Sequence, residues 1–340
     1  MQLHLVLPGL LWPGKALHDT AFDLDLPALS WLLGRGRQAW QPPQPLEHWL
    51  CGAFSIDQSP PPVAALRLLG EGGDPGEELW LCADPACLKI EQRRMSLDTS
   101  DVGVSAAEMQ QIVAALAPLL ADTGEFYAGE PGRAYLKLRR PPRLLTLPPS
   151  ATAGHSNPLP SGADADFWQR LGNEVQMLLH TLPLNAQRET AGRPLLNSLW
   201  FWGAGRLPPR TDSAAFFYQN VIGNHSLLNG LAAWSGISRS PAPTTPDALP
   251  HGSLLLLDTL QAATQQLDAL AWRTALMDIE RDWLQPLRQA LRAGRINCLR
   301  LTALGDEAIL DLTLTRGDAL KFWRRPQSLH ALNYRLAHTK

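Results

Sequence analysis

The sequence has few of the residues that build disulfide frameworks or zinc sites. Only four cysteines occur in 340 residues, Cys51, Cys82, Cys87 and Cys298, and none has the Cys-x-x-Cys spacing typical of zinc ligands. Cys82 and Cys87 are close enough in sequence to form a disulfide, but so low a count favours reduced thiols. The sequence therefore predicts a cytoplasmic protein without structural zinc.

Long apolar runs and a strong net charge are also missing. No run of 18 apolar residues exists to span a bilayer. The apolar stretch 3–12 has no basic leader and contains Pro8 and Gly9, which favours a buried first strand over a signal peptide. The formal net charge of −2 gives no overall field toward nucleic acid or membrane, so neither is expected as a partner, although a local basic patch could still bind an anion.

The chain is rich in apolar residues, arginine and tryptophan. With 45% hydrophobic residues it can bury a substantial core. Arginines outnumber lysines 25 to 5, but they are spread along the whole chain, which indicates genome composition rather than a binding site. The twelve tryptophans are expected in the core or at contact surfaces.

Apolar periodicity predicts strands and helices in an order that favours a mixed α/β fold. Ser105 and Glu108 form a capping-box pattern at the start of one helix, and Pro286 should kink or break another. The expected strands are 3–7, 79–82, 87–90, 135–138, 195–202, 296–301 and 308–314. The expected helices are 26–33, 46–51, 63–69, 105–120, 164–181, 261–292 and 318–323.

The run from Asn197 to Arg206 joins an apolar strand to a glycine turn. Its strand is expected to be buried on both faces. Gly203 and Gly205 can adopt positive φ and allow another backbone or a ligand to approach closely, while Arg206 supplies a cation. Two interpretations stay open: a core strand that ends in an ordinary turn, and the rim of a ligand pocket that also includes Trp202.

Asn224 and His225 precede a predicted helix, where free backbone N–H groups favour an anion. Together with Arg206 they would form a phosphate or carboxylate site. The alternative is that Asn224 caps the helix and His225 is solvated. The candidate ligand-binding residues are Trp202, Gly203, Gly205, Arg206, Asn224 and His225.

Three acidic residues lie close together in the long predicted helix, Asp278, Glu280 and Asp282. Their i, i+2 spacing points them to different faces, which argues against a catalytic carboxylate pair. The neighbouring Arg273, Arg281 and Arg288 predict ordinary ion pairs along the helix surface.

Several segments carry a resemblance to a known family. The Trp-Gly-Ala-Gly turn at 202–205, followed by 216–223 and 225–237, resembles the archaeal-type cofactor-independent phosphoglycerate mutases, and so do 254–258 and the helix with Met277 to Glu280. In the first half, 80–89 and 133–138 are similar to bacterial RpfE-type regulatory proteins, the group we suspect. The resemblance implies an alkaline-phosphatase-like mixed sheet flanked by helices.

The predicted domain division follows from this resemblance and from composition. Residues 141–160 are rich in Pro, Ser, Gly and Ala, which indicates a linker or exposed loop. We expect residues 1–70 and 151–340 to form the alkaline-phosphatase-like core. Residues 71–150 are expected to form a smaller α+β subdomain that ends in the proline-rich linker.

The metal ligands that the resemblance implies are absent from this sequence. Such enzymes hold two divalent metals with an Asp at the end of the first strand, an Asp-x-x-x-His, an Asp-His pair and a late His, beside a nucleophilic Ser. Here the first strand ends in Pro8-Gly9, position 262 after Asp258 is Ala, and no histidine occurs between His251 and His330. We therefore expect no catalytic residues, no metal and no cofactor.

Three hypotheses follow. The first is a catalytically degenerate phosphoglycerate-mutase-like protein that acts in regulation through a small anionic ligand or a protein partner. The second is a metal-dependent mutase or phosphatase whose ligands are unrecognised, for example Asp19, Asp258 and Asp306. The third is a structural interaction protein that uses exposed tryptophans as its contact surface.

Overall fold

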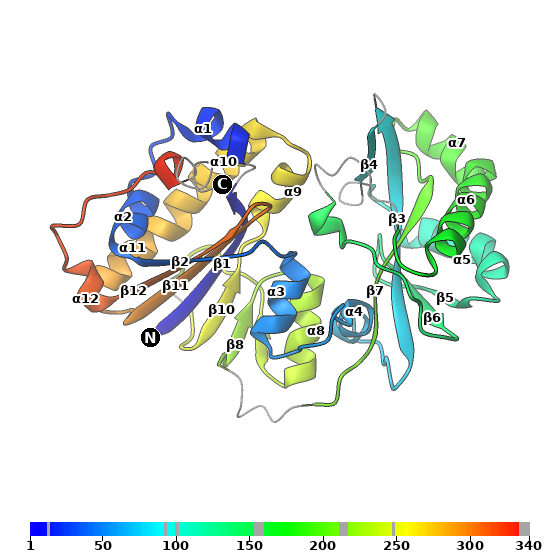
Figure 1. Cartoon of the computed structure of the whole chain (residues 1–340), viewed down its shortest axis with the longest axis horizontal. Helices are drawn as coiled ribbons and strands as arrows, with labels where there is room; N and C mark the ends of the chain where they lie inside the picture. The colour runs from blue at the N-terminus through cyan, green and yellow to red at the C-terminus, as the bar shows by residue number, and fades with distance from the viewer. Residues whose placement is uncertain are drawn as a thin grey trace. The chain divides into compact units, whose positions relative to one another are not determined.

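The computed structural model describes residues 1–11, 14–91, 94–98, 102–152, 160–210, 217–246 and 249–332 (Figure 1). The chain divides into two compact units, each built around its own sheet. Unit 1 comprises Met1–Leu46, Asp212–His225 and Ser235–Lys340, and unit 2 comprises Glu47–Thr211 and Ser226–Trp234.

Unit 1 is built on a seven-stranded mixed sheet with the order β2-β12-β11-β1-β10-β8-β9. The central strand β1 runs parallel to β10 and β11, whereas β12 runs antiparallel to β11 and to β2. The strands are β1 (Gln2–Leu11), β2 (Arg37–Gln41), β8 (Asn220–Ile222), β9 (Ser238–Ser240), β10 (Ser253–Leu256), β11 (Cys298–Gly305) and β12 (Ile309–Thr315). This arrangement confirms the predicted first strand and the predicted late strand pair.

Helices cover one face of this sheet and form the core of unit 1 with it. Leu3, Leu5 and Leu7 of β1 point into this core, because alternate strand residues share a face. Apolar residues of α2, α10 and α11 pack against them. The helices of unit 1 are α1 (Gly14–Ala21), α2 (Pro27–Arg35), α9 (Thr259–Gln265), α10 (Ala269–Ile279), α11 (Gln285–Arg292) and α12 (Arg316–Ala319).

The predicted long helix 261–292 is broken more than once. Asp268 caps α10 by accepting a hydrogen bond from the Ala271 N–H, so α9 and α10 are separate helices. A π-helical turn at Glu280–Leu284 then leads into α11. Pro286 is the second residue of α11 and directly follows this turn, so the helix is irregular beside the proline, where a kink or break was predicted.

Unit 2 contains a five-stranded sheet with the path β4-β3-β6-β5, and β7 pairs with β3. The two predicted strands 79–82 and 87–90 are one continuous strand, because residues 83–86 between them pair with β7. The strands are β3 (Leu79–Glu91), β4 (Arg94–Asp98), β5 (Gly124–Ala128), β6 (Ala134–Leu138) and β7 (Ser198–Arg206).

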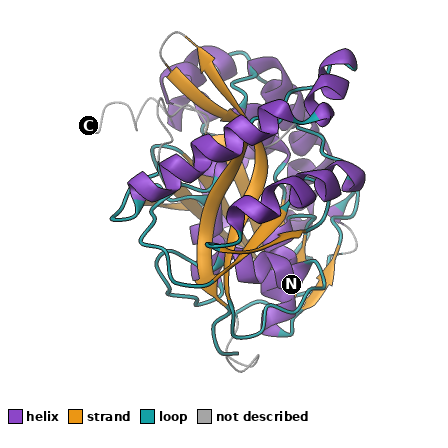
Figure 2. Cartoon of the chain, turned by 90° about the vertical axis from the view of Figure 1, so that its right-hand side faces the viewer, coloured by secondary structure: helices purple, strands orange, loops and turns teal. Residues whose placement is uncertain are grey.

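Both faces of the unit 2 sheet are covered. On one face α5 and α6 pack against Leu81 and Leu199. Figure 2 shows helices lying across strands on the side that faces the viewer. On the other face α4 contacts β3 and β7. The helices of unit 2 are α3 (Leu46–Ala53), α4 (Val63–Gly70), α5 (Ala106–Leu120), α6 (Ala165–Thr181), α7 (Pro183–Thr190) and α8 (Ser226–Ser235), with a 3₁₀ turn at Pro149–Ala151. The capping box of Ser105 and Glu108 is present as predicted.

The boundaries of the two units differ from the division expected at residues 70 and 151. Residues 47–70 belong to unit 2 because α4 packs on its sheet, and residues 160–206 belong there because β7 is a strand of that sheet. The sequence patterns gave no sign of this, since β7 pairs with a strand more than one hundred residues earlier.

Three further expectations concerned the closing helix, the cysteines and membrane-spanning segments. The closing helix expected at 318–323 ends earlier, as α12 stops at Ala319. All four cysteines are free thiols. Within the described ranges, none of the helices has the length and apolar character needed to span a bilayer.

Candidate functional site

The carboxyl end of β1 lies where the resemblance implies a metal-binding aspartate. Gly9 occupies this end with a φ of +81°, and its carbonyl accepts a hydrogen bond from the Trp272 Nε1 at 2.8 Å. A Cβ at Gly9 would lie 2.6 Å from the Thr264 Oγ1 and 3.0 Å from the Leu260 carbonyl oxygen. Helix α9 packs directly against β1 (Figure 1), so this end of the strand is closed by its own chain.

The acidic residues of unit 1 do not replace the missing ligand. Asp258 precedes α9, Asp306 lies in the turn between β11 and β12, and Asp19 is exposed on α1. Across the residues that the structure describes, no group of three or more His, Cys, Asp and Glu side chains could hold a metal ion. The donor set here therefore does not fit a pair of divalent metals.

Trp202 on β7 belongs to a buried polar network in unit 2. Its indole Nε1 donates to the Asp84 carboxylate at 2.8 Å. Arg67 of α4 binds the same carboxylate through both terminal nitrogens, at 2.8 and 2.6 Å. The Arg67 guanidinium also lies 5.3 Å from the Trp202 ring centroid, within range of a cation–π contact. Trp202 thus helps to hold this network together, and its role in ligand binding stays a prediction.

Tyr135 and Glu71 extend the network toward the surface. Arg67 Nε donates to the Tyr135 hydroxyl at 3.1 Å, and that hydroxyl donates to Glu71 at 2.6 Å. Burial opposes ionisation, yet the charge of Asp84 holds the pKa of Arg67 above its ordinary value. Asp84 was missed as an important residue in the sequence. An aspartate in the middle of an apolar strand was the available signal, because buried carboxylates require partners.

Gly203 and Gly205 allow another part of the chain to approach β7 closely. A Cβ at Gly203, whose φ is +65°, would lie 2.9 Å from the Val63 Cβ. A Cβ at Gly205 would lie 2.5 Å from the Pro62 Cβ. The two glycines therefore permit the start of α4 to pack on β7.

The remaining predicted ligand-binding residues belong to different units. Arg206 donates a hydrogen bond to the Glu77 carbonyl oxygen within unit 2. Asn224 and His225 follow β8 in unit 1, and α8 begins at Ser226, so His225 directly precedes the helix. Their role in anion binding stays a prediction.

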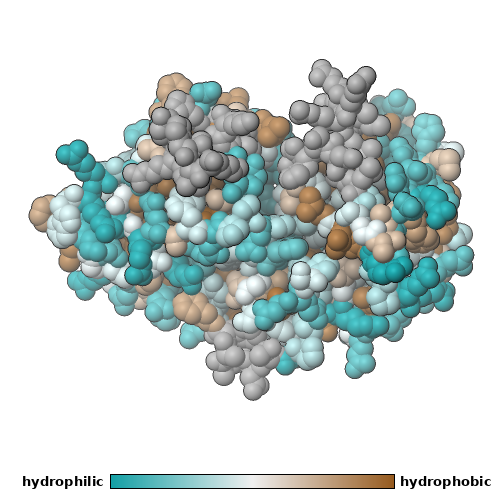
Figure 3. Space-filling model, in the orientation of Figure 1, coloured by the Kyte–Doolittle hydropathy of each residue, from teal (hydrophilic) through white to brown (hydrophobic). Residues whose placement is uncertain are grey.

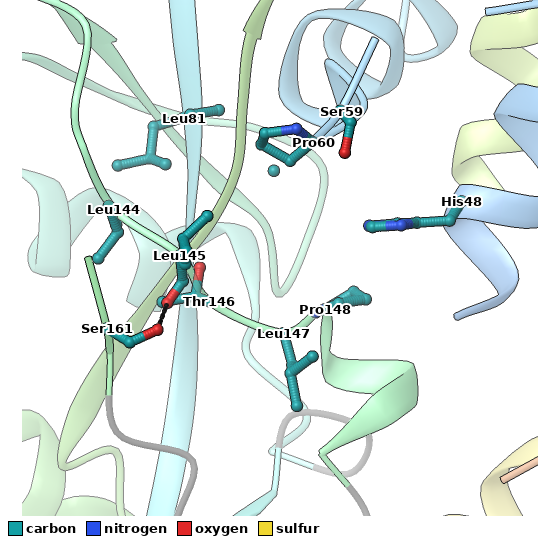
Figure 4. Close-up of a pocket in the computed structure, with 12 residues that line it drawn as sticks. His48, Ser59, Pro60, Leu81, Leu144, Leu145, Thr146, Leu147, Pro148 and Ser161 are labelled. Atoms are coloured by element: carbon teal, nitrogen blue, oxygen red, sulfur yellow. Dashed lines mark hydrogen bonds between the residues drawn. The ribbon is translucent and has the colours of Figure 1, made fainter. Parts of the chain in front are cut away.

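A cavity of about 410 Å³ lies in unit 2 (Figure 4). Its walls are mostly apolar, with Leu81 and the segment 144–148 on one side and Gly203 and Ala204 of β7 also lining it. His48 and Ser59 present polar groups to the cavity. Burial lowers the pKa of His48, so its imidazole is neutral near pH 7. Such a cavity suits a small, mostly apolar and uncharged molecule.

Glu280 also differs from its expected role as a surface residue of a helix. It is buried, and its two carboxylate oxygens accept hydrogen bonds from the Ala28 and Leu29 N–H groups at 2.6 and 2.9 Å. These two N–H groups lie in the first turn of α2, where the N-cap residue Leu26 supplies no side-chain hydrogen bond. The predicted surface pairing holds for its neighbours, since Arg281 pairs with Asp278 and Asp282.

Comparison with known proteins identifies the relationship of the chain. No family model matches it. Over 81 residues it is 31% identical to the 2,3-bisphosphoglycerate-independent phosphoglycerate mutase of Methanosarcina barkeri, a segment that covers 23% of this chain and 20% of that protein. Over 169 residues it is 27% identical to the corresponding mutase 2 of Methanothermobacter thermautotrophicus, which covers 46% of this chain and 41% of that protein.

The solved structure of the cofactor-independent phosphoglycerate mutase from Thermoplasma acidophilum resembles the whole chain. The TM-score is 0.52 at 18% identity, and the match covers 97% of this chain and 94% of that one. The fold is therefore the alkaline-phosphatase-like fold of these mutases, as predicted. The sequence matches support a divergent relative, but they span less than half of each curated protein.

Proposed function

We propose that this protein is a catalytically degenerate relative of the cofactor-independent phosphoglycerate mutases, with a binding or regulatory role. One observation carries the proposal, namely the closed carboxyl end of β1. Pro8 stands where the aspartate of the expected Asp-Gly would be, and the next residue is tightly packed. A Cβ at Gly9 would meet Thr264 and the Leu260 main chain, and the Gly9 carbonyl binds the Trp272 indole.

The physical argument rests on the chemistry of the ligands. Divalent metals that activate a phosphoryl group need anionic or imidazole ligands held in a fixed geometry. The end of β1 offers only main-chain carbonyls, and the Gly9 carbonyl already accepts the Trp272 N–H. Of the expected Asp-Gly, Pro8 takes the place of the aspartate and Gly9 that of the glycine, so a proline ring stands where the ligand would be. The mutase chemistry would need another set of ligands.

A binding role is supported by the cavity of unit 2. Among the residues that the structure describes, no lysine or arginine lines it, and its polar groups include the neutral His48 and the Ser59 hydroxyl. A ligand in this cavity would be uncharged and would bind by apolar burial and one or two hydrogen bonds. The small anionic ligand expected from the sequence would have to bind elsewhere. Assignment to the RpfE-type regulatory proteins is part of the proposal and rests on the sequence resemblance.

A metal-dependent mutase is the second candidate, and the names of the relatives favour it. It would require acidic residues such as Asp19, Asp258 and Asp306 to come together when metal binds. Asp19 is exposed and Asp306 lies in a turn, so each would have to move toward the others.

The deciding experiment measures conversion of 3-phosphoglycerate to 2-phosphoglycerate by the purified full chain, with saturating Mn²⁺ and with a chelator as control. We expect no metal-dependent turnover and no stoichiometric Mn²⁺ binding in equilibrium dialysis. Turnover that the chelator abolishes, together with tight Mn²⁺ binding, would overturn the proposal and establish the second candidate. Alanine at Asp258 would then test whether that carboxylate is a ligand.

A further inference from the structure

Three large apolar side chains are exposed just after α12. The exposed fractions are 69% for Leu320, 82% for Phe322 and 66% for Trp323, and the two rings lie edge to face with centroids 5.3 Å apart. On the face drawn in Figure 3, exposed apolar residues are scattered among hydrophilic ones. Three of four consecutive residues make an unusual concentration, which we call the aromatic tip, Leu320–Trp323.

The aromatic tip is attached firmly on both sides. Before it, the Ala319 carbonyl accepts a hydrogen bond from the Arg35 Nη1 at 2.6 Å. After it, the Arg324 Nη1 donates to the Arg35 carbonyl at 3.0 Å. The capping box of Thr315 and Asp318 fixes the start of α12. The rings are therefore exposed on an anchored segment of unit 1 and not on a loose end.

Basic side chains surround the aromatic tip. Lys321 and Arg324 flank the rings and, with Arg37 and the acidic Asp318, line a cavity of about 590 Å³. Arg316 and Arg325 are exposed nearby in sequence. The one acidic residue in this stretch, Asp318, pairs with Lys321 at 2.6 Å. Among the described residues, Arg37 and Arg324 have no ion-pair partner.

The cavity also contains an unused hydrogen-bond donor. The Gln327 Nε2 is buried and has no acceptor in the described part of the chain, although the Gln327 Oε1 accepts a bond from Gln38. Buried donors normally have acceptors. Guanidinium groups and an amide donor around one hollow match the oxygens of a phosphate group.

We propose that the aromatic tip, together with Arg37, Arg324 and Arg325, is a contact site for the surface of an anionic lipid bilayer. Phe322 and Trp323 would enter the interfacial region, where aromatic rings are favoured. The cations would bind headgroup phosphates beside them. This site is independent of the proposed function, because it uses none of the residues that close β1 or line the cavity of unit 2.

A bilayer matches these observations better than a protein partner. A protein would need a preformed pocket for two adjacent rings, whereas a bilayer accepts them without matching shape. The cations supply the charge complementarity. The net charge of −2 argued against membrane binding, but it describes only the average field of the whole chain. The local charge beside the aromatic tip is positive.

The test is co-sedimentation of the full chain with vesicles of phosphatidylcholine alone or mixed equally with phosphatidylglycerol. We expect binding only to the anionic vesicles. The double variant Phe322→Ser/Trp323→Ser should lower the partition coefficient at least about tenfold. The variant Arg324→Gln/Arg325→Gln should lower it about fivefold per charge. Exposed residues elsewhere provide the matched controls, Phe22→Ser and Arg170→Gln, which should bind as the unmodified protein does.

Several results would overturn the proposal. The first is that the protein does not bind the anionic vesicles. The second is that the Phe322→Ser/Trp323→Ser variant binds them as well as the unmodified protein does. The third is that the control variants lose as much binding as the test variants do. Release by millimolar inorganic phosphate at constant ionic strength would assign the cavity to free phosphate instead. Binding to polyglutamate without binding to vesicles would assign the surface to an acidic protein partner. Unchanged circular dichroism of each variant shows that it is folded.

Discussion

Replacing Asp84 by alanine removes the carboxylate at the centre of the buried network in unit 2. Asp84 accepts both terminal nitrogens of Arg67 and the indole N–H of Trp202, at 2.6 to 2.8 Å. Arg67 and Asp84 are each about 5% exposed. The substitution therefore leaves a guanidinium inside the protein without its counter-ion.

The expected loss of stability follows from that uncompensated charge. Removing one partner of a buried ion pair costs about 3–5 kcal/mol, and the unsatisfied Trp202 N–H adds about 1 kcal/mol. With a urea m-value of about 2 kcal/mol per molar, the unfolding midpoint of unit 2 should fall by about 2–3 M. The double variant Arg67→Leu/Asp84→Ala should recover part of this loss, because it removes the stranded charge as well.

The assay is urea unfolding followed by tryptophan fluorescence and by far-ultraviolet circular dichroism. The matched control is Asp164→Ala, which removes a carboxylate that also binds an arginine, Arg143, but at the surface of the same unit. We expect little change in its midpoint because water replaces the exposed interaction. A midpoint for Asp84→Ala as high as that of the control would refute the reasoning.

Three further predictions concern positions that the structure explains. Glu280→Ala should destabilise unit 1 by about 2 kcal/mol in urea unfolding, because the start of α2 loses both acceptors, while Asp282→Ala on the exposed side of the same turn should change little. Gly230→Ala should destabilise unit 2 by about 1–3 kcal/mol, since its Cβ would lie 1.9 Å from a carbonyl oxygen of α4. The Cβ of Gly172→Ala would meet nothing within 4 Å, so this variant should gain about 0.5–1 kcal/mol and raise the thermal midpoint. Burial and the charge of a nearby arginine lower the pKa of His4 from 6.5 to about 3, so the unfolded chain binds a proton below pH 6.5 that the folded chain does not. Stability should therefore fall as the pH drops, by about 2 kcal/mol between pH 7 and pH 5, and this loss should vanish in His4→Gln; an equal pH dependence in both proteins would contradict it.

Local patterns in the sequence predicted many elements correctly. The apolar run 195–202 predicted a strand buried on both faces, and residues 198–202 of β7 are buried. The glycine turn predicted after it was wrong, because residues 203–206 continue the strand. The spacing of Ser105 and Glu108 predicted a helix with its capping box. The pair 296–301 and 308–314 gave two antiparallel strands. These predictions succeeded because strand alternation and helix capping depend on residues a few positions apart.

The candidate site was predicted less well, because its residues meet only through the fold. Gly203 does line a cavity, but its conformation chiefly serves the packing of Val63 against β7. The sequence placed Trp202 in a strand, yet could not show that its N–H would find a carboxylate 118 positions earlier. Periodicity carries no information about partners at such separations.

The sequence by itself determined that the first strand ends in Pro8-Gly9, with no carboxylate for a metal, because the identity of a residue needs no fold to be known. Only the tertiary structure decided what fills that place. Gly9 is closed in by Trp272 and Thr264, and Glu280 caps a helix that begins some 250 residues before it. Both outcomes depend on hydrogen bonds between distant segments, whose geometry exists only once the chain has folded.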